Sequence, residues 1–326
     1  MNSLKGKRVL VTGAGGFIGS HLAERLVAEG ATVRAMVHYN ALNARGWLDH
    51  SEQRHAMEIV AGDITDAESV RGLVAGVDVV FHLAALIAIP YSYVAPRSYV
   101  RANVEGTLNV LEAARLHGVQ RVLHTSTSEV YGTARYAPID EAHPLQGQSP
   151  YSASKIAADK MAEAYHRSFG VPVVTVRPFN TFGPRQSTRA VIPTIITQLQ
   201  RGPAVQLGAL APTRDLNFVD NTVDGFIAAA VAEGAVGETI NLGTGREISI
   251  GDLAHLIASL MATPIELVQD SARDRPAASE VERLIASAER ARTLLGWTPK
   301  VSLEDGLRRA ITFFSARAGE HRGYVI

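Results

Sequence analysis

The sequence predicts an α/β fold in which a doubly wound parallel sheet carries helices on both faces. Short β-branched segments alternate with longer segments whose apolar residues recur at helical spacing, as parallel βαβ units require. The predicted strands are 8–13, 32–37, 58–63, 77–84, 121–126 and 172–178. The predicted helices are 21–30, 66–75, 99–118 and 151–170, each with a glycine near its end.

Composition narrows the possible partners. The chain has 326 residues, and its 32 Lys and Arg equal its 32 Asp and Glu, so no basic field favours nucleic acid or an anionic membrane. We therefore expect a small-molecule partner. The absence of cysteine excludes disulfides, thiol catalysis and cysteine-ligated metals. No apolar run resembles a signal peptide or is long enough to span a bilayer, so we expect a cytoplasmic protein.

A glycine-rich turn follows the first predicted strand. The segment TGAGGFIG places Gly13, Gly16 and Gly19 between that strand and a helix. Such glycines allow backbone N–H groups to approach a pyrophosphate closely, and a helix N-terminus favours the same anion. Because the turn lies in the first βαβ unit, the sequence predicts a Rossmann-type dinucleotide site.

The second predicted strand lacks the acid that commonly binds the adenosine ribose at such sites. No Asp or Glu occurs between 30 and 48, and Arg34, His38 and Arg45 lie nearby. NAD is the expected cofactor, with NADP left open. Asp63 is expected either to contact the adenine or to cap the following helix.

After about Pro178 the alternation becomes irregular, with repeated prolines and one further strand at 239–245. We expect residues 1–178 to form the dinucleotide-binding domain, with 236–250 returning to it. Residues 179–326 are expected to form mainly a smaller α/β substrate domain, with the ligand site in the cleft between the two.

Two polar segments indicate an active site. In TSTSEVYG, residues 125–132, hydroxyl groups and Glu129 end a strand, although Glu is a poor strand former and costly to bury. In YSASK, Tyr151 and Lys155 share one face at the start of a helix. A tyrosine with a pKa of about 10 acts as a base near neutral pH only beside a cation that stabilises the phenolate. Lys155 and an oxidised nicotinamide would supply that charge.

The whole chain resembles the extended short-chain dehydrogenases/reductases, whose members act on nucleotide-activated sugars. The resemblance rests on TGAGGFIG, GDI, HLAA, NVEGTLNVLEAA, STSEVYG, YSASK, RPFNTFGPR, TRDLNFV and NLGTG, which appear in the family's order. It implies that Tyr151 takes a proton from the sugar 4-hydroxyl while hydride passes from C4 to the nicotinamide. Lys155 would hold the nicotinamide ribose and lower the pKa of Tyr151, and Thr127 would hydrogen-bond the same sugar oxygen.

The resemblance also implies the cofactor contacts. They are Gly13, Gly16, Phe17, Ile18, Gly19, His38, Asn40, Asp63, Ile64, Leu83, Ala84, Ala85, Asn103, Thr125, Tyr151, Lys155 and Pro178. For Asn103 the alternative is a buried amide satisfied by the backbone.

Glu129 makes 4,6-dehydration the expected reaction. In an extended backbone, Thr127 and Glu129 would point to the same face. A carboxylate there can remove the C5 proton that a C4 ketone acidifies, so that water leaves C6 and hydride returns to C6. Ser128 stands where dTDP-glucose 4,6-dehydratases carry an Asp, and Thr-Ser-Glu is similar to the motif of GDP-mannose 4,6-dehydratases.

Other reactions remain open. A 4-epimerase needs no further acid or base, and UDP-glucuronate decarboxylases share STSEVYG and FNTFGPR. A uronic acid would need a cation such as Arg97, Arg185 or Arg189 for its carboxylate. The segments ALIAIPYSYVAPRSYVRANVEGT and RPAASEVERL most resemble NAD-dependent 4,6-dehydratases of nucleotide-activated N-acetylglucosamine.

The implied substrate is a nucleotide-diphosphate sugar, linked to UDP, GDP or dTDP. The expected contacts are Ser128, Asn180, Arg185, Val191, Ile192, Arg214, Asn241 and Arg275. Arginine suits the diphosphate because its planar fork binds phosphate oxygens in pairs, although each could instead form an ion pair within the protein.

Two further expectations concern metals and assembly. The 11 histidines are scattered without metal-ligand spacing, so no metal site is expected. Small side chains recur on the helices at 99–117 and 151–169, so we expect a homodimer formed through a four-helix bundle.

Overall fold

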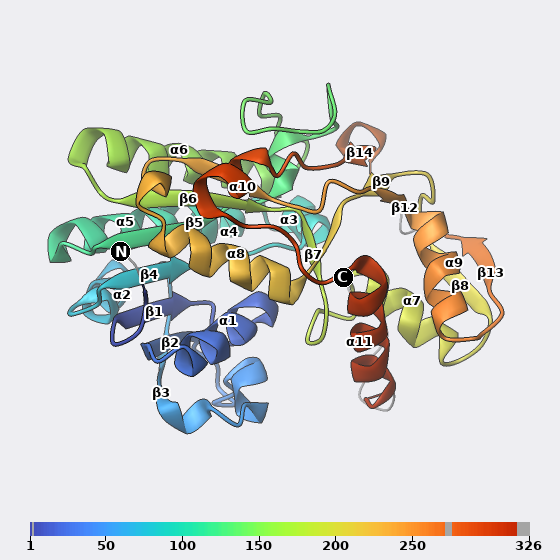
Figure 1. The fold of residues 1–326 in the computed structure, drawn as a ribbon, viewed down its shortest axis with the longest axis horizontal. Helices are drawn as coiled ribbons and strands as arrows, with labels where there is room; N and C mark the ends of the chain where they lie inside the picture. Colours follow the sequence, from blue (N-terminus) through green and yellow to red (C-terminus); the bar gives the residue numbers. More distant parts are fainter. Residues whose placement is uncertain (2, 271–275, 318–326) are drawn as a thin grey trace.

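The computed structural model describes residues 1, 3–270 and 276–317. A seven-stranded parallel sheet forms its centre, in the order β11-β6-β5-β4-β1-β2-β3 (Figure 1), which confirms the predicted fold class. Its strands are β1 (Arg8–Thr12), β2 (Thr32–His38), β3 (Met57–Gly62), β4 (Val79–His82), β5 (Arg121–Thr125), β6 (Val173–Pro178) and β11 (Thr239–Leu242).

Helices cover both faces of this sheet. The covering helices are α1 (Phe17–Ala28), α2 (Ala67–Val74), α5 (Gly106–His117), α6 (Pro150–Phe169), α8 (Val219–Val231) and α10 (Glu289–Leu295). Along β1, Val9 and Val11 pack with the core that includes Leu22 of α1, whereas Leu10 packs with the core that includes Val110 of α5. This alternation explains why the buried parallel strands are apolar on both faces.

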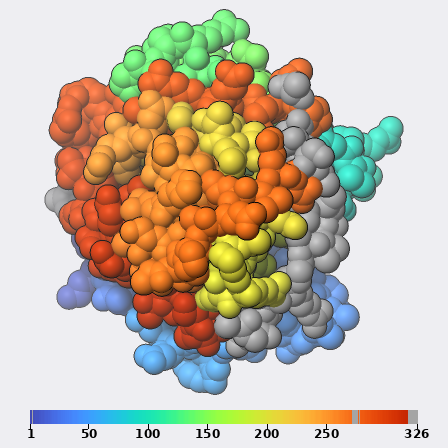
Figure 2. Space-filling model, turned by 90° about the vertical axis from the view of Figure 1, so that its right-hand side faces the viewer, coloured from blue at the N-terminus to red at the C-terminus, as the bar shows by residue number. Residues whose placement is uncertain are grey.

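Residues beyond β6 build most of a smaller unit on the right of Figure 1. Its elements are β7 (Asn180–Phe182), α7 (Val191–Leu199), β8 (Ala204–Leu207), β9 (Thr213–Arg214), β10 (Leu216–Phe218), β12 (Ile248–Ser249), α9 (Ile250–Leu260), β13 (Glu266–Gln269), β14 (Arg283–Leu284) and α11 (Leu303–Ser315). Figure 2 views this end, where yellow, orange and red segments fill the centre of the surface.

The chain returns to the central sheet after residue 178. Strand β11, within the segment 236–250 that was expected to return, pairs in parallel with β6, and α8 also packs on the sheet against β5 and β6. Before α5, the helix α3 (Ile89–Val94), the helix α4 (Pro96–Tyr99) and a π-helical turn (Val100–Glu105) lead into α5. Among the described residues, no helix has the length and apolar character needed to cross a membrane.

The glycine turn requires glycine at the third position of its motif, Gly19. A Cβ added at Gly19 would lie 2.2 Å from the carbonyl oxygen of Gly13, which is backbone and has little freedom to move. Helix α1 can therefore lie this close to the end of β1 only without a side chain at that position.

Replacing Gly19 by alanine should lower the free energy of unfolding by about 1–3 kcal/mol, because the new methyl group overpacks the turn. Urea unfolding followed by circular dichroism measures the change. Gly72→Ala, on the exposed side of α2 with open space around it, is the matched control and should be neutral or slightly stabilising. A Gly19→Ala variant as stable as the wild type would contradict this account of the turn.

Candidate active site

The turn between β1 and α1 has the shape of an anion cradle. Gly13 adopts a left-handed conformation with φ of 71°, and a Cβ there would lie 2.9 Å from the backbone nitrogen of Ala84. Gly16 caps α1 without a side-chain hydrogen bond, so no side chain competes for the first N–H groups, which include those of Phe17 and Ile18. These features fit the pyrophosphate of a dinucleotide.

Two polar side chains of β2 and the loop after it, Arg34 and Asn40, are already hydrogen-bonded within the protein. This limits the side chains there that can bind a cofactor. Arg34 donates to Glu58 and to the Leu73 carbonyl oxygen, so it is not available for a 2′-phosphate. The Asn40 amide is used within its own loop, where it accepts from the Ala44 N–H and donates to the Ala44 carbonyl. His38 is exposed at the strand end.

The Asp63 carboxylate is bound within the turn before α2, and the N-cap of α2 is Asp66 and not Asp63. Asp63 Oδ1 accepts hydrogen bonds from the backbone N–H and the hydroxyl of Thr65, both at 2.8 Å, and these bonds contribute to a lowered pKa of Asp63. The next residue, Ile64, is buried and packs against Gly106. Asp63 therefore has a defined role in the turn before α2, whether or not it meets an adenine.

A segment that sequence analysis did not single out lies on the glycine turn. The Trp47 N–H donates to the Gly15 carbonyl oxygen at 3.0 Å, and the Trp47 ring meets Phe313 of α11 edge-on, with ring centroids 5.6 Å apart. Gly46 makes this approach possible, because a Cβ there would lie 2.3 Å from the Gly15 oxygen. The signal in the sequence was weak, since RGWLD has no recognisable motif.

The remaining expected cofactor contacts follow the carboxyl ends of parallel strands. The N–H groups of Leu83 and Ala84 donate to the Thr12 hydroxyl at 3.1 and 3.0 Å, which holds the chain after β4, including Ala85, beside the glycine turn. Thr125 ends β5 and Pro178 ends β6. Strand ends at one sheet edge are where such folds bind ligands.

The expectation that Asn103 contacts the cofactor is not supported. Its amide nitrogen donates to the Leu86 carbonyl and to Ser154, and its amide oxygen accepts from the Leu86 N–H. Only 1% of Asn103 is exposed. Because its amide is satisfied within the protein, the structural alternative holds.

Tyr151 and Lys155 come together on α6, as their spacing predicts. The helix begins with a capping box between Ser149 and Ser152. Tyr151 is 7% exposed and Lys155 4% exposed, and the Lys155 ammonium donates to the Thr125 carbonyl oxygen at 2.7 Å. Burial lowers the pKa of Lys155 to about 8, against the opposing charge of Asp159.

The electrostatics of Tyr151 differ from the expectation. Burial raises the pKa of the Tyr151 phenol, the charge of Glu129 raises it further, and a hydrogen bond with Thr127 acts in the opposite direction. The Lys155 ammonium is directed to the Thr125 carbonyl. In the protein alone, Tyr151 is therefore a phenol beside Thr127, and its activation requires additional positive charge.

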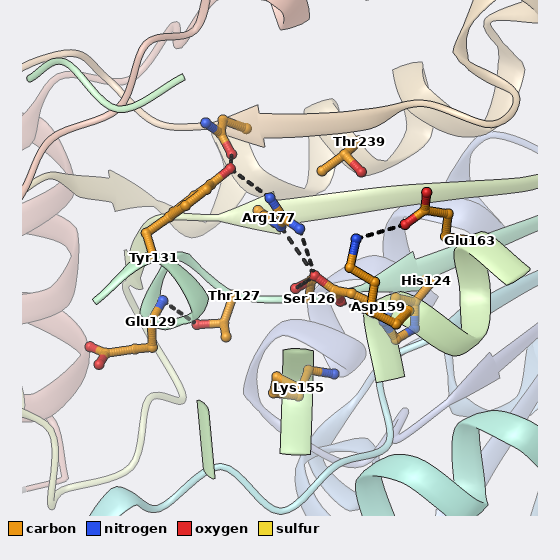
Figure 3. A network of polar contacts seen from close by, with 12 residues as sticks. His124, Ser126, Thr127, Glu129, Tyr131, Lys155, Asp159, Glu163, Arg177 and Thr239 are labelled. Carbon is orange, nitrogen blue, oxygen red and sulfur yellow. Dashed lines mark hydrogen bonds and ion pairs between the residues drawn. The ribbon is translucent and has the colours of Figure 1, made fainter. Parts of the chain in front are cut away.

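Glu129 reaches the site by a different geometry from the one expected. Residues Ser128–Tyr131 form a 3₁₀ turn rather than extended strand, with the Thr127 hydroxyl accepting from the Glu129 N–H at 3.2 Å. The argument that alternation places Thr127 and Glu129 on one face is therefore wrong. Figure 3 shows the Glu129 carboxylate directed away from the Asp159 cluster. Glu129 is half-buried, and its charge acts on Tyr151.

Several expected substrate contacts are engaged elsewhere. Arg185 donates to Ser20 and Glu24 of α1, so it joins the two units instead of facing a ligand. Asn241 is fully buried, where its side chain accepts from the Tyr131 hydroxyl and donates to the Ile139 carbonyl. Neither side chain is free to bind a diphosphate in this structure.

The other expected contacts vary in availability. Arg214 is 6% exposed and forms an ion pair with Glu280 at 3.1 Å. Asn180 at the start of β7 is half-buried, and its amide oxygen has no hydrogen-bond partner among the described residues. Val191 and Ile192 begin α7, whose first turn has no side-chain cap, and Ser128 is buried. Arg275 lies outside the described residues.

A buried charge cluster, which sequence analysis missed, lies beside the site. His124, Ser126 and Arg177 all bond to the carboxylate of Asp159, and Arg177 continues the network to Tyr131 (Figure 3). The signal in the sequence was available, because Asp159 follows Lys155 by the same interval that separates Lys155 from Tyr151. A cavity of about 470 Å³ borders this cluster, lined by Asp159 and Arg177 but not by Tyr151.

The fold and the site together define a dinucleotide-dependent enzyme, and comparisons with known proteins agree. A family model described as GDP-mannose 4,6 dehydratase matches residues 10–310. The UDP-glucose 4-epimerase of Mycolicibacterium smegmatis is 36% identical over 314 residues, which are 94% of this chain and 98% of that protein. The dTDP-glucose 4,6-dehydratase of Actinoplanes sp. is 33% identical over 321 residues, which are 95% of this chain and 98% of that one.

A solved structure extends the similarity to three dimensions. The dTDP-glucose 4,6-dehydratase DesIV of Streptomyces venezuelae, solved with NAD bound, matches with a TM-score of 0.87 at 31% identity over 96% of this chain and 98% of that one. The chain therefore belongs to the nucleotide-sugar dehydratase and epimerase family of extended short-chain dehydrogenases/reductases. Relatives with different reactions are similar to nearly the same degree, so identity alone does not assign the reaction.

If Tyr151 is the base, Tyr151→Phe should lower kcat by about 10²- to 10⁴-fold, because the phenolic oxygen is lost while the ring still fills its place. Isothermal titration should show NAD binding within a few-fold of the wild type. Tyr165→Phe, which removes a hydroxyl from the same helix, is the control and should retain activity. Near-normal turnover by Tyr151→Phe would remove Tyr151 from the reaction.

Proposed function

We propose that the protein is a nucleotide-sugar 4,6-dehydratase that uses NAD. The observation that supports this choice is the half-buried carboxylate of Glu129, whose charge acts on the Tyr151 phenol. An epimerase needs a base at O4 but no second base nearby. A reaction that continues beyond C4 needs a second base to remove the C5 proton, and a carboxylate whose charge acts on that phenol can serve as this base.

Thr127, Tyr151 and Lys155 have separate roles in the oxidation at C4. NAD bound at the glycine turn would supply the hydride acceptor for C4, the hydride donor for C6 and, in its oxidised form, a positive charge that favours the Tyr151 phenolate. Tyr151 removes the proton of the 4-hydroxyl, and the Thr127 hydroxyl orients the same oxygen. Lys155 holds the nicotinamide ribose.

Glu129 catalyses the elimination of water that follows oxidation at C4. Its carboxylate removes the C5 proton, which the neighbouring ketone acidifies, and delivers a proton to the C6 hydroxyl as that group leaves as water. Hydride returned to C6 and a proton taken up from solvent at C5 complete a 4-keto-6-deoxy sugar. The proton that Tyr151 took from the 4-hydroxyl passes to solvent, so the net change is the loss of one water. Ser128 carries no acidic proton, and Glu129 therefore serves as both base and acid.

A 4-epimerase is the second candidate, because the 36% identical relative from Mycolicibacterium smegmatis is a UDP-glucose 4-epimerase. A reaction on UDP-glucuronate would need a cation for the sugar carboxylate. Arg185 is paired with Glu24, whereas Arg97 and Arg189 are exposed. The pairing of Arg185 weakens the uronic acid alternatives without removing them.

The products formed in deuterated water distinguish these reactions. The protein and NAD are incubated with a panel of sugar nucleotides, and the products are analysed by mass spectrometry. We expect dehydration, which appears as loss of one water with deuterium at C5. The panel contains UDP-N-acetylglucosamine, GDP-N-acetylglucosamine, dTDP-glucose, GDP-mannose and UDP-glucuronate. Decarboxylation would instead release carbon dioxide, and epimerisation would leave the mass unchanged.

Glu129→Gln should lower dehydration by about 10²-fold or more, because the amide cannot remove the C5 proton. Glu163→Gln neutralises a carboxylate on α6 that is 40% exposed and should leave turnover intact. Full dehydration by Glu129→Gln, with loss only in Tyr151→Phe, would favour the epimerase.

The proposal extends to location and assembly. The absence of cysteine supports a cytoplasmic location. Helices α5 and α6 lie side by side, and Ala153, Ala157 and Ala164 recur on one face of α6 without being buried. Small exposed residues permit close helix packing, so we propose that this face forms a homodimer through a four-helix bundle.

Sedimentation equilibrium should give twice the chain mass of 34.9 kDa for the wild type. Ala157→Arg should shift the protein toward a monomer, because a bulky charge prevents close packing of the two helices. Ala41→Arg, in an exposed loop after β2, is the matched control and should remain dimeric. A wild-type protein that stays monomeric would exclude this assembly.

A further inference from the structure

Helix α6 carries a third buried polar group beyond the catalytic pair. Tyr151, Lys155 and Asp159 recur at four-residue intervals, so they lie along one face of the helix. Asp159 is 5% exposed, close to the 4% of Lys155. A carboxylate at such a depth is costly unless its charge and its lone pairs are matched by the protein.

Three neighbouring side chains match the Asp159 carboxylate. Its Oδ2 accepts from the Ser126 hydroxyl at 2.8 Å and from Arg177 Nη2 and Nε at 2.9 and 3.1 Å, and its Oδ1 lies 3.1 Å from His124 Nε2. Burial opposes ionisation, but the bond from His124 and the charge of Arg177 lower the pKa of Asp159 to about 2. Asp159 therefore carries its charge at every pH at which the enzyme works.

Among the charged or titratable groups near Lys155, Asp159 is the buried one whose negative charge can balance the Lys155 ammonium. The charge of Lys155 interacts with Asp159 of α6, His82 of β4 and His124 of β5. Of the neighbouring groups, Tyr151 lies one turn earlier on α6, Arg177 of β6 bonds to Asp159, and the charge of Glu129 acts on Tyr151. Burial lowers the pKa of both His82 and His124, so these histidines are neutral. The Thr125 carbonyl that accepts from the ammonium is also neutral.

We propose that Asp159 is a positioning residue whose charge keeps Lys155 in the ammonium form, directed to the end of β5 and next to Tyr151. The inference rests on the proposed role of Lys155 in holding the nicotinamide ribose. Asp159 touches no reacting atom in this scheme. The bonds from Ser126, His124 and Arg177 fix the carboxylate one helical turn beyond Lys155, where its field acts on the ammonium through a buried, low-dielectric region.

The titration of Lys155 tests this directly, because the chain has only five lysines. We would label them with ¹⁵N and titrate the NAD-loaded protein by NMR, with Lys155→Arg identifying the Lys155 signal. Asp159→Asn should lower the Lys155 midpoint by about 1 unit or more while the other four stay unchanged. Ser126→Ala, which removes one bond to Asp159 but no charge, should shift it far less.

A Lys155 midpoint in Asp159→Asn equal to that of the wild type would overturn the proposal. If that variant fails to fold, the double variant Asp159→Asn with Arg177→Met removes both members of the buried pair and leaves neither charge uncompensated. It should show a downward shift smaller than that of Asp159→Asn, because losing the Arg177 charge partly offsets losing the Asp159 charge. No downward shift there would overturn the proposal equally. The signal requires no turnover, so an error in the assigned reaction would leave this result standing.

Discussion

The ion pair between Asp159 and Arg177 is the interaction on which the rest of the site depends. It joins α6 to β6, and bonds from His124 and Ser126 add the end of β5. The two segments that carry Thr127 and Tyr151 are thereby fixed to the same carboxylate. Removing one member of a buried pair leaves an uncompensated charge, so we regard this cluster as part of the framework of the site.

The two halves of the chain are also joined near the cofactor cradle. Arg185, after β7, pairs with Glu24 of α1, and Trp47 meets Phe313 of α11. Both contacts connect the helix or turn that would hold the pyrophosphate to residues of the second half. Arg185 adopts a left-handed backbone conformation with φ of 70°, an uncommon one for a side chain other than glycine. The two units are therefore fixed to each other near the glycine turn.

The fold could be predicted because its signals are local. The period of the strands, the glycine turn and the spacing of Tyr151 and Lys155 each depend on a short segment, and the structure has all three. Pairings between distant segments could not be predicted. Arg185 was expected to bind the substrate because its partner Glu24 is far away in sequence, and Asn241 because its hydrogen-bond partner Tyr131 is equally remote.

The 3₁₀ turn at 128–131 shows a different limit. Hydroxyl-rich residues after β5 are compatible with strand or turn, and only the bond from the Glu129 N–H to Thr127 reveals the turn. In the turn, the Glu129 side chain points in a different direction from the one expected for a strand. Its charge nevertheless raises the pKa of Tyr151. The proposed role of Glu129 thus rests on the effect of its charge on Tyr151 and not on strand alternation.

The central claim is that Thr127, Tyr151 and Lys155 carry out oxidation at C4 and that Glu129 acts only afterwards. Rapid mixing of NAD-loaded protein with its sugar nucleotide, followed by the absorbance of reduced nicotinamide, tests this order most directly. The account predicts that reduced cofactor appears and decays in the wild type but accumulates in Glu129→Gln, where elimination is blocked after hydride transfer. A Glu129→Gln variant that shows the same rise and decay as the wild type would contradict it.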